Sequence, residues 1–416
     1  MNAAGIDVSS RKSTVAVLRP FGEVVCLPFD VAHNAEGLTS LAQQLKELDG
    51  ETRVVMEHTG RYYEPVAKAL HDAGLYVSAV NPLLIKEYGG NSLRRVKTDK
   101  ADAMKIARYA LDNWADLRDY TPMDTIRYDL KTLNRQFQLA SKQRTACSNN
   151  LIALLEQSFP GIRKCFDSPV RSDGTQKWVD FAHTFWHVDC VRKQSLNAFS
   201  ERYRKWCKRH GYIFKQSNAE EVYSLAKNAV VLVPKSNVTK ILVQEAANQL
   251  TSLSRSVETY RTEMERLASM LPEYPVVMEM YGVGKSFGPQ LMAEIGDVRR
   301  FERKQALVAF AGIDPMPNQS GDKNVRSNKS SKRGSPYLRK TLFNVMGIYL
   351  KCAPQDEPVF QFLDRKRSEG KPFYVYMTAA SNKFLRRYYA KVRDYLATLE
   401  DLPPVDMDST GLQGSD

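Results

Sequence analysis

A carboxylate in the middle of an apolar strand is the feature that most constrains this chain. Asp7 interrupts Ala3–Val8, a segment that otherwise has the short apolar pattern of a buried strand. Glu57 ends a second apolar strand, Arg53–Glu57. A buried carboxylate is costly unless it is paired or binds a metal. The N-terminal region therefore has to fold so that both charges are compensated.

Residues 1–120 have the pattern of an α/β domain. Three strands come first, at Ala3–Val8, Ser13–Leu18 and Glu23–Leu27. Helical and strand patterns then alternate, in the segments Leu38–Leu48, Arg53–Glu57, Glu64–Ala73, Tyr76–Val80 and Lys100–Leu111. This order predicts a mixed sheet with helices on its faces.

Two further carboxylates, Asp99 and Asp102, begin the helix near Lys100, and their three-residue spacing puts them on one helix face. Taken alone they fit a solvated helix start. Together with Asp7 and Glu57 they would form four mutually repelling carboxylates that need divalent cations. Hard oxygen ligands select Mg²⁺ or Mn²⁺. Two such ions can stabilise both oxygens of a phosphodiester displacement.

Length and charge narrow the class of protein. A chain of 416 residues predicts two or three domains, and its net charge of +13 favours nucleic acid as partner over other ligands. A merely basic soluble protein is the alternative. The sequence shows neither a long apolar run nor a signal-peptide layout, which predicts no membrane association and a cytoplasmic protein. The six cysteines are then expected to be reduced thiols.

Residues 121–272 have a helical pattern. From Val243 to Leu271 apolar residues recur at alternating steps of three and four, the seam pattern of a coiled coil. An intermolecular coiled coil and a helical hairpin within one chain both fit. The stretch between the helices has no clear type, but His187 and Cys190, then Cys207 and His210, have zinc-like spacing. Ordinary helix-face residues are the simpler interpretation.

Residues 273–400 form a third, mostly helical region. Gly282-Val-Gly284 before Lys285 and the apolar helix Phe287–Ile295 resembles a helix-hairpin-helix turn, whose backbone N–H groups hold a phosphate; a plain helical connection also fits. A small-residue segment follows that carries the basic residues Lys323, Arg326, Lys329, Lys332, Arg333, Arg339 and Lys340. It predicts a nucleic-acid contact, with a solvated loop as the alternative. The acidic tail, 401–416, is expected to be disordered.

Actin-like sugar kinases also open with a Gly-Ile-Asp strand and a strand pair. The sequence offers no convincing second phosphate loop, because Gly284-Lys-Ser286 lacks the upstream glycine and strand of a P-loop. This argues against the kinase class.

The chain also resembles a known family, the Piv/MooV-type transposases of the bacterial insertion-sequence family numbered one hundred and ten, known as bridge-RNA-guided recombinases. The resemblance covers about residues 3–115 and 273–395. The matching motifs are Gly5-Ile-Asp7, Met56-Glu-His-Thr-Gly60, Thr98-Asp-Lys-Ala-Asp102, Gly282-Val-Gly284 and Phe310-Ala-Gly-Ile-Asp-Pro315 with Gln319-Ser-Gly321. Compact members have a shorter stretch than residues 160–237.

The resemblance implies an RNase H/RuvC-like domain, a coiled-coil insert and a small helical transposase domain. It implies that Asp7, Glu57, Asp99 and Asp102 bind metal, and that Ser320 attacks DNA to give a phosphoserine intermediate. It further implies a structured guide RNA and a homo-oligomer, a dimer or tetramer, acting on donor and target DNA. From the residues alone nothing selects Ser320, because no His or Asp base is adjacent.

Two other functions stay open at this point. A RuvC-type metal-dependent nuclease would use the same carboxylates to hydrolyse DNA without a covalent intermediate. A non-catalytic nucleic-acid scaffold would have kept only the fold. The complete carboxylate set argues against the scaffold, because a scaffold does not need these charges together.

Overall fold

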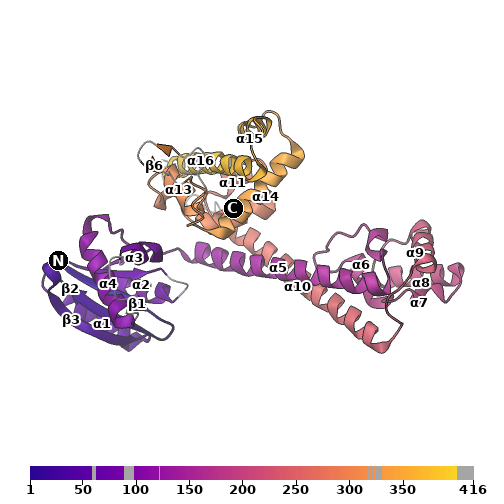
Figure 1. The fold of residues 1–416 in the computed structure, drawn as a ribbon, viewed down its shortest axis with the longest axis horizontal. Helices are drawn as coiled ribbons and strands as arrows, with labels where there is room; N and C mark the ends of the chain where they lie inside the picture. The colour runs from indigo at the N-terminus through magenta and orange to yellow at the C-terminus, as the bar shows by residue number, and fades with distance from the viewer. Residues whose placement is uncertain are drawn as a thin grey trace, which may run out of the picture. The chain divides into compact units, whose positions relative to one another are not determined.

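The computed structural model divides the chain into two compact units, Met1–Met123 and Asp124–Asp416 (Figure 1). It describes residues 1–58, 62–88, 98–120, 122–315 and 330–400, and the backbone alone at 319–320 and 323–324. The predicted disordered tail lies outside these residues. No helix in the described ranges is long and apolar enough to cross a membrane.

The first unit is built on a five-stranded mixed sheet, as predicted. Its strands are β1 (Asn2–Val8), β2 (Lys12–Leu18), β3 (Val24–Ala32), β4 (Thr52–Glu57) and β5 (Tyr76–Val80). Their order across the sheet is β3-β2-β1-β4-β5. The first three strands are antiparallel, and β4 and β5 run parallel to β1. The predicted third strand was too short: β3 continues through Pro28, which an edge strand accommodates.

Helices cover both faces of this sheet. The helices of the unit are α1 (Ala35–Lys46), α2 (Tyr63–Asp72), α3 (Pro82–Tyr88) and α4 (Asp99–Asp112). Ile6 and Met56 are buried with residues of α1 and α2. Ala3 and Val55 are buried with Ile106 of α4 on the opposite face. Side chains alternate between the faces of a strand, so these clusters fix which residues face α4.

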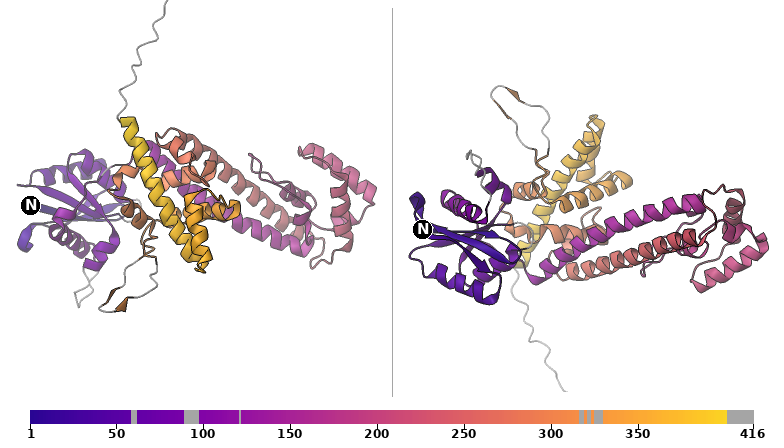
Figure 2. Two further views of the ribbon diagram at one scale, coloured as in Figure 1. Left: turned by 90° about the horizontal axis from the view of Figure 1, so that it is seen from above. Right: turned by 60° about the horizontal axis from the view of Figure 1, so that its bottom comes forward.

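The second unit is helical and is organised by two long helices, α5 (Thr125–Ser158) and α10 (Asn237–Ser269), which lie side by side (Figure 2). Seven of the nine residues in the heptad pattern are buried within the chain, all except Leu253 and Tyr260. The buried ones are Val243, Ala246, Leu250, Val257, Met264, Leu267 and Leu271. The seam is thus that of a helical hairpin within one chain. It gives no argument for an intermolecular coiled coil, because its apolar residues are already covered.

The other helices of this unit form two groups. The first group follows α5 and precedes α10 in the sequence, and consists of α6 (Lys177–Thr184), α7 (Asp189–Arg192), α8 (Leu196–Arg209) and α9 (Gln216–Asn228). After α10 come α11 (Tyr274–Met278), α12 (Gly284–Ile295), α13 (Lys304–Ala311), α14 (Pro336–Cys352), α15 (Pro358–Ser368) and α16 (Phe373–Glu400). Each group has its own apolar core. The stretch without a predicted type is therefore helical, and its aromatic residues form a core.

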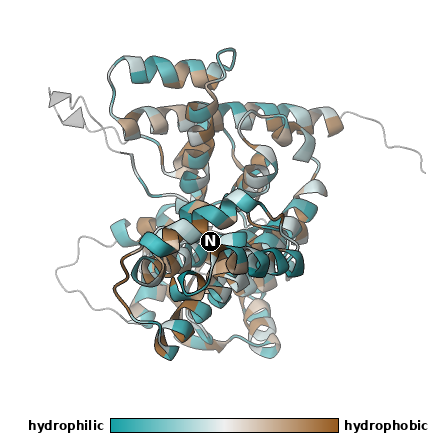
Figure 3. Ribbon diagram, turned by 90° about the vertical axis from the view of Figure 1, so that its right-hand side faces the viewer, coloured by the Kyte–Doolittle hydropathy of each residue, from teal (hydrophilic) through white to brown (hydrophobic). Residues whose placement is uncertain are grey.

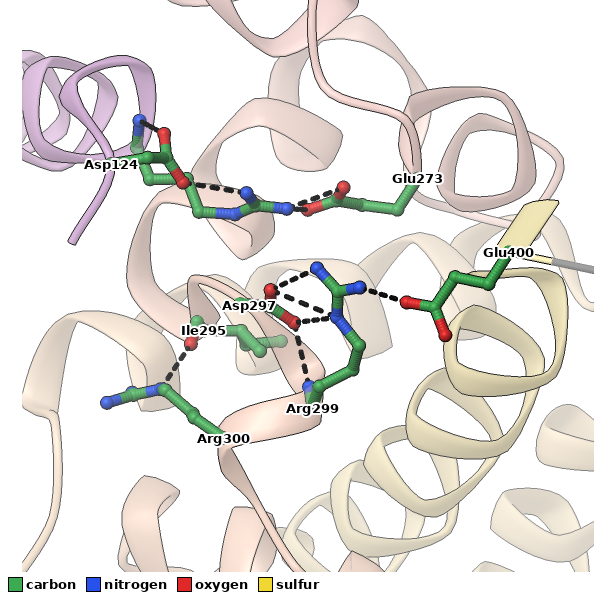
Figure 4. A network of polar contacts seen from close by, with 8 residues as sticks. Asp124, Glu273, Ile295, Asp297, Arg299, Arg300 and Glu400 are labelled. Atoms are coloured by element: carbon green, nitrogen blue, oxygen red, sulfur yellow. Dashed lines mark hydrogen bonds and ion pairs between the residues drawn. The ribbon is translucent and has the colours of Figure 1, made fainter. Parts of the chain in front are cut away.

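A buried ion pair joins the start of α5 to the end of the long hairpin (Figure 4). The Arg127 guanidinium donates to both carboxylate oxygens of Glu273, at 2.6 and 2.7 Å, and to Asp124 at 2.8 Å. Glu273 is only 1% exposed. Removing one partner of such a pair leaves the other charge buried without compensation.

We expect Glu273→Gln to lower the free energy of unfolding by about 3 kcal/mol, because Arg127 keeps its buried charge but loses its buried partner, and only the half-exposed Asp124 is left to pair with it. Urea unfolding followed by circular dichroism measures this. The matched control is Glu263→Gln, which removes an exposed pair with Arg266 and should cost less than about 1 kcal/mol. Equal effects of the two substitutions would contradict the structural role of the buried pair.

Candidate active site

Asp7 and Glu57 lie next to one another at the edge where β1 and β4 end. The parallel register pairs Ile6 with Met56, so the two carboxylate residues follow at the same level. Ala3 and Val55 face α4, and alternation along each strand puts Asp7 and Glu57 on that same face. Both are half-buried, and each has a polar or electrostatic partner.

Helix α4 brings the other two carboxylates to this end of the sheet. It packs on β1 so closely that a Cβ on Gly5 would lie 2.3 Å from the Ala103 oxygen and from the Ala107 nitrogen. Ala3 instead clusters with residues further along α4. Helix α4 therefore runs antiparallel to β1. Its first turn, which carries Asp99 and Asp102, lies at the end of β1 that carries Asp7.

The sheet-facing stripe of α4 includes both acids. Asp99 and Asp102 extend, at helical spacing, the buried positions Ala103, Ile106 and Ala107. Thr98 caps the helix, its hydroxyl accepting from the Ala101 N–H at 3.2 Å. Acids in the first turn of a helix also interact favourably with the helix dipole, so these positions fit a solvated helix start as well. Asp102 is half-buried and Asp99 is exposed. The structure thus places this first turn at one end of the sheet, which spacing alone could not provide.

The donor chemistry fits a divalent cation, since all four groups are carboxylates directed to one end of one sheet face. Within the described residues, no three His, Cys, Asp or Glu side chains are gathered closely enough to hold a metal ion as they stand. Binding would therefore require these side chains to converge from the positions that the backbone sets.

Sequence reasoning missed a polar row on this face of the sheet. Thr14 pairs with Asp7 across β1 and β2 and donates to Asp30 of β3 at 2.8 Å. Lys12 is ion-paired to Asp30 at 2.6 Å. This hydrogen bond raises the pKa of Lys12 and lowers that of Asp30, so both stay charged at neutral pH. Asp30 could not be found from the sequence because the strand was predicted to end at Leu27.

We expect Gly5→Ala to push α4 away from β1, because the new methyl group meets backbone atoms that have no room to yield. The cost should be about 1–3 kcal/mol of stability, with loss of catalysis as Asp99 and Asp102 move. Thermal unfolding and DNA cleavage measure the two effects. The control Gly347→Ala adds a methyl group in open space within a helix and should be neutral or slightly stabilising. Full activity of Gly5→Ala would contradict this placement of α4.

In the second unit, Ser320 lies on a two-residue strand, β6 (Gln319–Ser320), paired with β7 (Lys323–Asn324). The register places Ser320 opposite Lys323. The base of this hairpin is held by the Pro315 and Ser330 bridge, next to a hydrogen bond from Ser331 to Asp314. The predicted contacts Arg326 and Lys329 lie outside the described residues.

The other predicted nucleic-acid contacts differ in their surroundings. Lys332 and Arg333 are exposed, with Lys332 in the left-handed backbone region at a φ of 52°. The Arg339 guanidinium instead donates to the carbonyls of Ala311 and Gly334, and burial lowers its pKa. Lys340 donates to Gln138 of α5 at 2.8 Å. These last two cations thus have partners within the chain, although Lys340 stays exposed, and their spacing in the sequence did not reveal these partners.

The glycines of the predicted hairpin turn both adopt left-handed backbone, with φ of 75° at Gly282 and 50° at Gly284. A Cβ on Gly282 would contact Tyr349 at 3.2 Å, whereas Gly284 faces open space. Gly284 and the exposed Lys285 begin α12. The helix start is therefore three residues earlier than predicted.

The residues with zinc-like spacing lie in or next to helices around the aromatic core, in keeping with the simpler interpretation. Nε2 of His187 lies 3.1 Å from the Val233 carbonyl, and its Nδ1 accepts from the Asp189 N–H at 3.1 Å. Both ring nitrogens are thus engaged, which leaves no free lone pair for a metal. Burial raises the pKa of Cys190 and of Cys207, which disfavours a thiolate ligand at either position.

Comparison with known proteins agrees with this arrangement of two functional regions. A family model described as "Transposase" matches residues 4–160, and one described as "Transposase IS116/IS110/IS902 family" matches residues 274–360. The chain is 23% identical to the insertion element IS116 uncharacterized 44.8 kDa protein of Streptomyces clavuligerus, over 88% of each chain. It is also 23% identical to the pilin gene-inverting protein of Moraxella bovis, over 82% of this chain and 80% of that protein.

A shorter match is closer in sequence. The transposase for insertion sequence element IS1111A of Coxiella burnetii is 31% identical over 29% of this chain and 32% of its own. A solved structure, T. thermophilus RuvC in complex with a Holliday junction substrate, aligns with 28% of this chain and 96% of its own at 16% identity and a TM-score of 0.22. We draw nothing from so weak a structural likeness.

These matches define the class of protein as a transposase, an enzyme that acts on DNA. The two models together match more than half of the sequence, and the chain belongs to the IS116/IS110/IS902 family of transposases.

Proposed function

We propose that this enzyme cuts and rejoins DNA through a phosphoserine intermediate on Ser320, assisted by Asp7, Glu57, Asp99 and Asp102. The observation that carries the proposal is the placement of four carboxylates at one end of one sheet face, in a chain whose second family match includes Ser320. The mixed sheet, with three antiparallel strands and then two parallel ones, supports the RNase H/RuvC-like domain that the family resemblance implies.

In the proposed reaction the Ser320 hydroxyl oxygen forms a bond to a DNA phosphorus. The bond from that phosphorus to a sugar oxygen breaks, and the serine proton ends on the leaving oxygen. A hydroxyl of another DNA end then attacks the same phosphorus and restores the serine. Mg²⁺ or Mn²⁺, held by the four carboxylates, would stabilise the charge that develops on the phosphate. Phosphodiester bonds are conserved in number, so rejoining needs no ATP.

The partners follow from the same proposal. Donor and target DNA would be read through a structured guide RNA, as the family resemblance implies, and the enzyme would act as a homo-oligomer. Lys323, Lys332, Arg333, Gly284 and Lys285 are exposed or lie on the anchored hairpin, which favours them as phosphate contacts. Arg339 and Lys340 would act indirectly, by holding the hairpin's base and α14.

A RuvC-type hydrolytic nuclease is the second candidate, because the carboxylate set by itself suffices to activate water on a phosphate. A trapping assay separates the two. Protein, Mg²⁺, the structured RNA of its element and DNA spanning the element junction are mixed and run on a denaturing gel. A protein–DNA band that resists denaturation supports the serine recombinase; cleaved DNA without such a band supports the nuclease.

A further inference from the structure

The insert, residues 161–240 between α5 and the first turn of α10, carries a charge that the proposed chemistry does not use. It contains fifteen Lys and Arg against seven Asp and Glu, a net charge of +8 out of +13 for the whole chain. About a fifth of the sequence therefore supplies most of its excess positive charge. Such a local excess attracts polyanions.

Helix α8 (Leu196–Arg209) is held in the insert by an aromatic core. Phe199, Tyr203 and Trp206 lie on its buried face, with exposed fractions of 4% or less. Their rings stack in sequence, at centroid distances of 5.8 and 5.6 Å. The Trp206 indole also donates to Thr184 of α6 at 3.0 Å. This packing fixes which side of the helix faces outward.

The outward side of α8 is a basic stripe. Arg202 donates to the Cys190 carbonyl, and Arg204 pairs with Glu201. The exposed side chains of Lys205, Lys208 and Arg209 have no hydrogen bond or ion pair within the described residues. Their spacing of three and four places them on one face, where like charges repel and destabilise the helix by a few tenths of a kcal/mol. Figure 3 looks onto this end of the second unit and shows many hydrophilic residues along its helices.

We propose that this stripe of α8, Lys205, Lys208 and Arg209, binds the phosphate backbone of double-stranded DNA. Cations without partners on a fixed helix complement a regular row of phosphates, and they contact the backbone without reading its sequence. A helix can lie in the major groove of B-DNA, where side chains such as these reach the phosphates at the groove's edges. The major groove of an RNA duplex is too deep and narrow for this, which favours DNA over RNA. The site is separate from Ser320 and does not depend on the covalent chemistry.

The position of the insert predicts where on the DNA this contact falls. The insert's core includes Leu151 of α5, and the core of the C-terminal helices includes Leu130. A separation of 21 residues along one helix corresponds to about 30 Å. That length equals roughly nine base pairs of B-DNA. The contact would thus involve DNA flanking the segment that the C-terminal helices meet.

The test is the salt dependence of binding by the full-length protein to a labelled DNA duplex of about 30 base pairs, between about 50 and 200 mM salt. The variant combines Lys205→Gln, Lys208→Gln and Arg209→Gln. We expect affinity to fall about tenfold or more at the lower salt, and the slope of log affinity against log salt to decrease by about 2 to 3. We expect the variant to fold, because all three side chains are exposed, and circular dichroism checks that its helices are intact.

A matched variant removes the same charge from the same insert, through Lys227→Gln, Lys235→Gln and Lys240→Gln, all at exposed positions outside α8. It should bind DNA within about twofold of the unmodified protein, because separated surface charges are screened. Equal losses in both variants would overturn the proposal in favour of a general charge effect. Unchanged DNA binding by the α8 variant would also overturn it, as would a loss confined to an RNA duplex of the same length.

Discussion

Ser320→Ala is expected to abolish the covalent protein–DNA adduct and strand rejoining while DNA binding persists. The physical reason is that alanine lacks the oxygen that would bond to phosphorus, whereas the hairpin backbone around it can stay in place. Ser320 lies in a short strand pair whose base is fixed by the Pro315 and Ser330 bridge, so a small residue is tolerated there. The trapping gel, run beside an electrophoretic binding assay, separates the two effects.

The control for this experiment is Ser330→Ala, at a serine whose backbone forms the bridge at the base of the same hairpin. It should keep the adduct, because the bridge does not depend on the side chain. An adduct that survives Ser320→Ala would refute the phosphoserine proposal. An adduct lost only in Ser330→Ala would move the nucleophile to the hairpin base.

Asp7→Asn should reduce DNA cleavage by about a thousandfold or more, because metal stabilisation of a phosphoryl transition state is worth several kcal/mol. Asn retains the size of the side chain and one acceptor oxygen, but it replaces the other oxygen by an NH2 donor and removes the charge that a divalent cation requires. Asp7 is half-buried at a strand end next to Glu57, so a fold change is not expected. Rates of single-turnover cleavage at increasing Mg²⁺ and Mn²⁺ measure the effect.

Asp112→Asn is the matched control for the carboxylates. Asp112 is the last residue of α4, at the opposite end of the helix from Asp99 and Asp102, and its carboxylate accepts a hydrogen bond from the Tyr88 hydroxyl. Its removal should leave cleavage within a few-fold of the unmodified enzyme. If Asp7→Asn and Asp112→Asn behave alike, the carboxylate site is not catalytic, and the non-catalytic scaffold becomes the better interpretation.

The strands of the first unit could be predicted because each is a short apolar run closed by a turn. Asp7 and Glu57 were identifiable for the same reason, since a charge in such a run is unusual. Asp30 was not, because the third strand was predicted to end at Leu27, whereas β3 continues through Pro28, which its edge position allows. Local composition cannot indicate which strand lies at an edge.

The long helices show a different limit. The apolar pattern from Val243 to Leu271 predicted a helix that buries one seam, and that seam is buried. Periodicity does not name the partner, however, and only packing showed that α5 of the same chain covers it. Similarly, Arg339 and Lys340 looked like free cations until the structure placed carbonyl and amide oxygens beside them.

The sequence by itself determined the mixed sheet and the helical remainder, because these depend on local apolar patterning. It also singled out the four carboxylates of the proposed site, Asp7 and Glu57 as charges in apolar strands and Asp99 and Asp102 by their spacing at a helix start. The tertiary structure decided that α4 runs against β1 at Gly5 and so directs Asp99 and Asp102 toward Asp7. It also decided which cations remain available on α8. Both outcomes depend on contacts between residues far apart in the chain, which no local pattern encodes.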